Sequence, residues 1–174
     1  MINRIRQVFS ALTASVTAAD REFVEMNLSK QEQQLFWKMN LPDQRHALNV
    51  AYTALDMAKC KQLNITVLTK CALLHDVGKV KGDVSTLDKI ITVLAHKLAP
   101  HWAKEWGRRG RGSRLTNLRH AFYTYFNHPD LSADLLRMIG VSPVIIDIVS
   151  KHHKAPEESD PPELVILKAA DDLH

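Results

Sequence analysis

Histidine and aspartate residues recur in this sequence at places where helices are expected to begin or end. His75 and Asp76 form an adjacent pair where an apolar stretch gives way to Val-Gly-Lys, and His152 and His153 form a second adjacent pair. Three further residues occupy comparable places: His46, His128 and Asp171. Imidazole and carboxylate groups together suit metal ions such as Fe, Mn, Zn or Ni, and one aspartate can bridge two ions. Two bridged ions polarise a phosphoryl group and activate water, which is a route to phosphate-ester hydrolysis.

A single histidine beside an apolar helix face is usually a structural residue, so the metal hypothesis depends on the recurrence of the pattern. Either of two neighbouring aspartates near the end of the sequence, Asp171 or Asp172, could serve as a metal ligand. Asp171 is preferred because it shares a helix face with the apolar residues Leu164 and Leu167.

Helix signals cover nearly the whole chain and strand-like alternation is absent, so the predicted class is all-α. Ser29 and Glu32 form a capping box that opens a helix expected to reach about Asn40. Further helices are expected over 43–62, 66–75, 86–99, 115–126, 131–139, 143–152 and from about 161 onward. The glycine-rich stretch 107–113 is expected to be a loop. Pro129 is expected to hold His128 outside helical geometry, just before the helix over 131–139.

The chain has the size and composition of one globular domain, with 174 residues of which 45% are hydrophobic. We expect an N-terminal helical segment over 1–40, which packs on or extends the core, and a second part over 41–174 that carries the histidines. The segment's apolar residues, three and four apart, predict an amphipathic helix rather than an export signal: Ile2, Ile5, Phe9, Leu12 and Val16. Cys60 and Cys71 fit reduced thiols in a cytoplasmic protein, and no apolar run is long enough to cross a bilayer.

Residues 71–80, Cys-Ala-Leu-Leu-His-Asp-Val-Gly-Lys-Val, resemble the defining segment of the HD-domain metal-dependent phosphohydrolases, in the form called HDIG. The order of the other histidines and of the final Ala-Asp is also similar, so the resemblance covers roughly 40–172. It implies a single compact helical bundle of about eight or nine helices. It also implies two divalent transition-metal ions, with Fe or Mn favoured and Zn or Ni also suitable, and a hydroxide that bridges the ions as the nucleophile.

The resemblance implies two metal positions that share Asp76 as the bridge. The first would be formed by His46, His75, Asp76 and Asp171. The second would be formed by Asp76, His128 and His152. His153 is then either an alternative to His152 or a residue that orients a carboxylate or the substrate. Lys79 would hold a phosphate oxygen or stabilise charge in the transition state.

The implied activity is hydrolysis of a phosphomonoester or phosphodiester, with a nucleotide favoured as substrate. Residues 154–159, Lys-Ala-Pro-Glu-Glu-Ser, lack the Gly-Tyr-Pro segment of the HD-GYP phosphodiesterases, so cyclic-di-GMP is not the expected substrate. Two alternatives stay open. One is a mixed-valent di-iron oxygenase, which has a similar set of ligands, although Lys79 favours a hydrolase. The other is a non-catalytic regulatory or binding domain in which the metal ions only stabilise the fold.

The net positive charge of the chain comes from the segment between Lys104 and Arg119, where six basic residues accompany one acid. The rest of the chain is close to neutral, so the basic character is local. Such a segment is usually a solvated loop. A second hypothesis is a phosphate-gathering loop in which Arg108, Arg109 and Arg111 bind the substrate. Contact with a membrane surface or a nucleic acid through the same segment is a weaker alternative.

Overall fold

A computed structural model describes residues 15–59, 61–82 and 84–174 of the protein. The described part is all helical, as predicted, and contains nine helices and one isolated β-bridge between Met39 and Val80. The helices are α2 (Ala18–Asn27), α3 (Lys30–Trp37), α4 (Leu41–Met57), α5 (Ile65–Leu74), α6 (Thr86–Leu98), α7 (Pro100–Trp106), α8 (Arg114–Met138), α9 (Pro143–Lys151) and α10 (Pro162–Asp171). None of these described helices could span a membrane.

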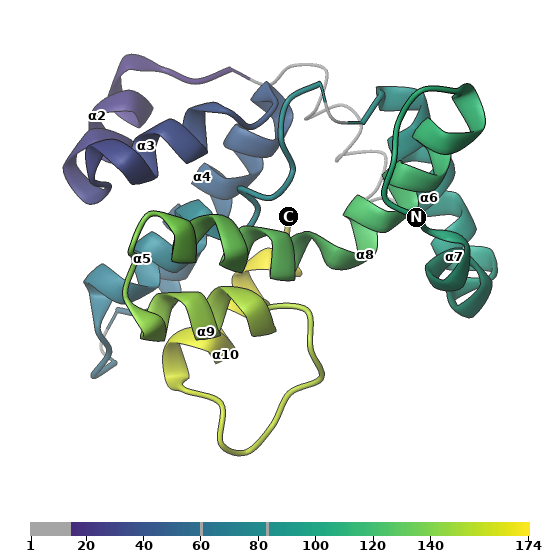
Figure 1. Ribbon diagram of the computed structural model, residues 1–174. Coiled ribbons are helices and arrows are strands. Elements are labelled where there is room, and N and C mark those ends of the chain that lie inside the picture. The colour runs from purple at the N-terminus through teal and green to yellow at the C-terminus, as the bar shows by residue number, and fades with distance from the viewer. Residues whose placement is uncertain (1–14, 60, 83) are drawn as a thin grey trace.

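The core lies where α4, α5, α9, α10 and the second half of α8 meet. The α5 segment has a fully buried run from Cys71 to Leu74, and α4 contributes the small residues Ala47, Ala51 and Ala54 to the same interior. Small residues let α4 and α5 approach closely, which brings the ends of both helices together. The helices α2 and α3 pack against α5 from one side. Figure 1 shows α6 and α7 set apart from this bundle, against the first half of α8.

Several predicted helix boundaries are confirmed by the structure. Ser29 and Glu32 form the capping box of α3, and the Ser85 side chain caps α6. Pro100 ends α6 and occupies the first turn of α7, where its missing N–H group is not needed. Residues 107–113 form a loop. The stripe predicted between Ile2 and Val16 lies mostly outside the described residues, as does Cys60, while Cys71 is a buried free thiol.

Two boundaries were predicted wrongly. The helix expected over 43–62 ends at Met57, because the chain must turn before Asn64, whose side chain caps α5. The two helices expected over 115–126 and 131–139 are one continuous helix, α8, with Pro129 inside it. His128 is therefore a mid-helix residue and does not precede a helix. A proline removes one backbone hydrogen bond, and in α8 a hydrogen bond from the His128 ring replaces it.

The buried carboxylate of Asp20 connects α2 to α4. Asp20 lies 2.6 Å from an Arg45 guanidinium nitrogen, and it accepts hydrogen bonds from the Tyr52 hydroxyl and from the backbone and hydroxyl of Thr17. Burial would raise the pKa of Asp20, but the Arg45 guanidinium and the Thr17 and Tyr52 donors outweigh it and hold the pKa well below its usual range. Burial and the bond to Asp20 raise the pKa of Tyr52 to about 12.

This network predicts a pH-dependent contribution to stability. The folded-state pKa of Asp20 lies below its unfolded value of about 3.9, so the contribution is present above about pH 4 and is lost as the pH falls toward the folded pKa. We expect Asp20→Asn to lower the free energy of unfolding by about 2 kcal/mol at neutral pH, and the gap to the wild type to shrink below about pH 4. Denaturant titrations across this pH range measure both effects. Asp56→Asn, in an exposed pair with Lys59, is the matched control and should change stability little at either pH. If the difference in free energy of unfolding between the wild type and Asp20→Asn did not change with pH, the lowered pKa of Asp20 would be contradicted.

Candidate metal centre

Two of the predicted metal ligands are oriented by the ends of their own helices. His75 and His152 are the C-terminal capping residues of α5 and α9. Each places its Nδ1 atom against the carbonyl three residues earlier, at 2.8 Å from Ala72 and at 2.6 Å from Val149. Carbonyls in the last turn of a helix lack the usual backbone donor. A carbonyl can only accept, so Nδ1 must carry the proton, and Nε2 is the ring nitrogen left to bind a ligand.

His128 is oriented in the same way inside a continuous helix. Its Nδ1 atom lies 2.7 Å from the carbonyl of Tyr125. In an unbroken helix that carbonyl would accept from the N–H of residue 129, but residue 129 is a proline and has none. The His128 ring therefore supplies the hydrogen bond that Pro129 removes. The same proline that was expected to end the helix instead fixes the histidine tautomer.

The carboxylates lie between these rings. The Nε2 atom of His46 is 2.9 Å from Asp171 Oδ1, and it is 3.3 Å from Nε2 of His75. The Oδ1 atom of Asp76 is 3.3 Å from His128 Nε2, and its Oδ2 atom is 3.4 Å from His75 Nε2. Asp76 thus has a histidine nitrogen on each side, one from α5 and one from α8.

Three buried polar atoms of this cluster have no hydrogen-bond partner among the described residues: Asp76 Oδ1, His128 Nε2 and His152 Nε2. Buried polar atoms are rarely left without a partner in folded proteins. Ligand atoms within 4.8 Å of one another form three overlapping groups: His46, His75 and Asp76; His128, His152 and His153; and His75, His152 and Asp171. Nitrogen and carboxylate donors facing each other without partners are what a divalent metal ion requires, so the residues present fit a metal centre.

The electrostatics of the rings agree with this fit. Burial lowers the pKa of His128 well below its usual range, and burial lowers the pKa of His152 to about 3. Both imidazoles are therefore neutral at physiological pH and keep a lone pair on Nε2. A neutral imidazole is the form that binds a metal ion.

The carboxylates are ionised and attract positive charge. Burial opposes ionisation of Asp76, but the ammonium of Lys79 and the His75 ring outweigh it and hold the pKa of Asp76 well below its usual range. Burial likewise opposes ionisation of Asp171, which the His46 and His75 rings outweigh, so its pKa is also lowered. Burial opposes the charged form of His75, yet Asp76 and Asp171 raise the pKa of His75 to about 9. The centre of the cluster is a place where a cation is stabilised.

The HD domain family matches residues 44–174, about three quarters of the chain. The chain belongs to the HD domain family. Members of this family are typically metal-dependent phosphohydrolases. No curated protein and no solved structure matches the chain. The HD pair itself is His75-Asp76, at the end of α5, in the middle of the cluster of predicted metal ligands.

The structure brings all seven predicted metal ligands of this HD domain into one cluster, while their individual roles stay predictions. His153 lies beside His152 and His128, with ring centroids 4.2 Å and 4.9 Å away, so it is a neighbour of His152 rather than a distant alternative. Half of its side chain is exposed, unlike that of His152. Lys79 donates to Asp76 Oδ2 at 2.7 Å.

The cluster opens into a cavity of about 950 Å³ between the bundle and the α6–α7 part of the molecule. Arg108, Arg109 and Arg111 are exposed on the 107–113 loop and are not among the residues that line this cavity. His96 and His101, whose positions in the sequence match no ligand spacing, both line the cavity, together with Lys104 and Tyr125. Pro100 is the feature of the sequence that could have indicated this position. It separates α6 from α7 and changes the direction of the chain, so that His96 and His101 face the same cavity.

Gly78 fixes the HD turn against α8. Its N–H donates to the Ser132 hydroxyl at 2.9 Å, and a Cβ atom at this position would lie 2.8 Å from the His128 carbonyl oxygen and 2.9 Å from the Ser132 nitrogen. The backbone after Asp76 therefore lies directly on the helical turn that carries His128. Only glycine permits this approach, which sets the distance between Asp76 and His128.

We expect Gly78→Ala to separate Asp76 from His128 and to weaken metal binding by at least about tenfold, with a loss of about 1–3 kcal/mol in stability. Metal titrations followed by calorimetry, with thermal unfolding of the metal-free protein, measure the two effects. Gly82→Ala is the control, because its Cβ would meet nothing within 4 Å, although its positive φ of 78° adds some backbone strain. Metal affinity equal to that of the wild type in Gly78→Ala would show that this contact does not set the ligand geometry.

Proposed function

We propose that the protein is a metal-dependent phosphohydrolase that cleaves a phosphomonoester or phosphodiester bond, with a nucleotide as the favoured substrate. The observation that carries the proposal is the set of buried, unpartnered donors around Asp76 at the wall of an open cavity. The family assignment supports the same reaction class. A cavity of about 950 Å³ is large enough for a substrate well beyond a single phosphate group.

The proposed metal ligands divide around Asp76. His46, His75 and Asp171 would complete one position, and His128 and His152 would complete the other, with His153 beside the second. Two divalent ions held by these residues would polarise a phosphoryl group and would lower the pKa of bound water to near neutrality. The backbone carbonyls that accept from Nδ1 of His75, His128 and His152 hold these rings in fixed orientations, so the protein does not have to reorganise during the reaction.

Lys79 is the proposed catalytic residue outside the metal ligands. Its ammonium bonds to Asp76 Oδ2 at 2.7 Å and lines the cavity, so it lies at the boundary between the ligand cluster and the space for substrate. Burial would lower the pKa of Lys79, but Asp76 and Asp43 outweigh it and raise the pKa, so the side chain stays charged. A fixed cation at this place can bind a phosphate oxygen and stabilise the charge that develops on it.

We expect Lys79→Met to lower kcat for phosphate-ester hydrolysis by about 10²–10³ while bound metal is retained. Steady-state kinetics with one phosphomonoester and one phosphodiester, beside elemental analysis, measure this. Lys81→Met, on an exposed lysine two residues later that does not line the cavity, is the matched control. Oxygen consumption by the iron-loaded protein without any ester hydrolysis would contradict the proposal in favour of an oxygenase. Metal binding with neither activity would favour a regulatory domain.

A further inference from the structure

The two walls of the cavity differ in the side chains that line them. The wall formed by α4, the HD turn and the end of α10 carries every carboxylate among the lining residues, namely Asp43, Asp76, Asp171 and Asp172. The facing wall, from α6 and α7, is lined by His96, His101 and Lys104 with Val93 and Pro100, and it has no carboxylate. A substrate in this cavity therefore meets the metal ligands on one side and basic groups on the other.

The basic groups of α7 are available to a ligand. His101 and Lys104 are exposed to the cavity, and within the described part of the chain neither side chain is engaged in an ion pair. They are three residues apart on α7, so they lie on one face of the helix. An ammonium and an imidazole side by side can donate to two oxygens of one anionic group.

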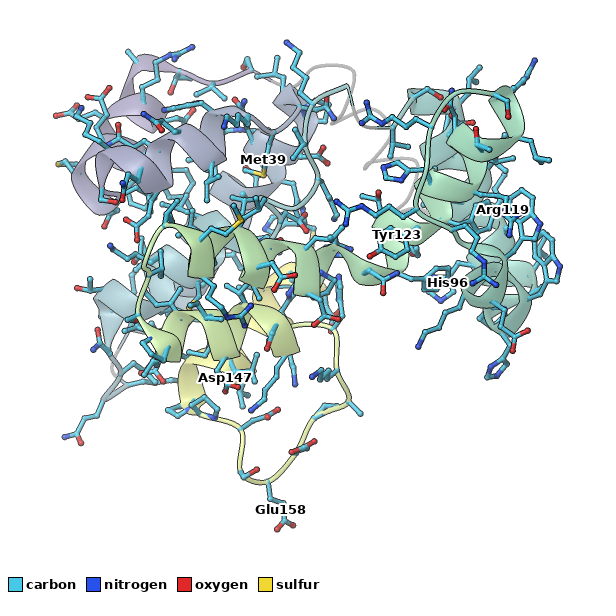
Figure 2. The ribbon with its side chains drawn as sticks, in the orientation of Figure 1. Met39, His96, Arg119, Tyr123, Asp147 and Glu158 are labelled. Atoms are coloured by element: carbon cyan, nitrogen blue, oxygen red, sulfur yellow. The ribbon has the colours of Figure 1, made fainter. Side chains whose placement is uncertain are left out.

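His96 is held in place beside them. Its Nδ1 atom is 2.8 Å from the Tyr125 hydroxyl, and its ring lies 5.0 Å from the ring of Phe126. Figure 2 shows His96 within the part of the molecule built from α6, α7 and the start of α8, away from Asp147 on α9. A positioned imidazole loses little side-chain entropy when it binds a ligand. The wall thus combines one ordered donor with two exposed ones.

We propose that the α6–α7 wall binds a second phosphate group of the substrate, so that the preferred substrates carry two separate phosphates. This inference rests on the proposed hydrolase function, in which the scissile phosphate lies at the Asp76 cluster. His101 and Lys104 hold the distal phosphate, and His96 supplies a third donor. Charge-assisted hydrogen bonds to phosphate are stronger than those to neutral groups, so the second phosphate adds affinity and sets the orientation of the substrate.

The test compares two ligands that differ by one phosphate, adenosine 5′-monophosphate and adenosine 3′,5′-bisphosphate. Calorimetry with the full chain, freed of metal by a chelator and checked for folding by circular dichroism, measures binding without turnover. We expect the bisphosphate to bind at least about tenfold more tightly, and the His101→Gln, Lys104→Met double variant to lose this preference. Lys97→Met, an exposed lysine on α6 that does not line the cavity, should keep it.

Equal affinities for the two ligands in the wild type, or a preference that survives in the double variant, would overturn the proposal. The proposal would also be overturned if an Arg108→Ala, Arg109→Ala, Arg111→Ala variant lost the preference while the double variant kept it. The distal phosphate would then bind to the 107–113 loop. The same ligands are then tested as substrates of the metal-loaded protein. A binding preference without turnover would support the second phosphate site and contradict the hydrolase function. Turnover without a binding preference would support the hydrolase function and contradict the second phosphate site.

Discussion

The candidate site depends on three backbone carbonyls that lack the N–H donor four residues later that a continuous helix supplies. Ala72 and Val149 lie in the last turns of α5 and α9, and Tyr125 precedes Pro129 by four residues in α8. In each case the histidine three residues later donates Nδ1–H to the carbonyl. One physical requirement, that a buried carbonyl be satisfied, thereby fixes the tautomer and direction of three rings. Their Nε2 atoms then converge on Asp76 and Asp171 because the C-terminal ends of α5 and α9 bring His75 and His152 close to His128 in the middle of α8.

The long helix α8 connects the two halves of the cavity. Its middle carries His128 into the ligand cluster, and the preceding turn carries Tyr125 and Phe126 to the facing wall. The close contact of Gly78 with this helix ties the HD turn to the same frame. Because Pro129 does not break α8, the ligand cluster and the α6–α7 wall are held by one continuous element. In the proposed substrate complex, the spacing between the scissile phosphate and the distal phosphate would therefore be set by this helix.

Much of the fold, and the residues that gather in the candidate site, could be predicted from the sequence, since capping residues, prolines and helical spacing are local signals. Ser29 with Glu32 and the His75-Asp76 pair are of this kind. The effect of Pro129 was not predictable locally, because it depends on a side chain replacing a lost N–H group. The sequence also could not predict which face of α6 turns toward the cavity. Helical spacing favours burying Leu87, Leu94 and Leu98, yet these are exposed and His96 faces the cavity. Tertiary placement overrides the periodic signal there.

The most direct test of the central claim is the metal content of the protein purified without added metal. We expect about two equivalents of Fe, Mn, Zn or Ni per chain, as for a bridged pair of ions. We expect about one equivalent in His128→Ala, none in the His75→Ala, Asp76→Ala variant, and no change in His101→Ala, whose histidine lies on the facing wall. Wild-type protein that binds no metal, even after reconstitution, would contradict the account.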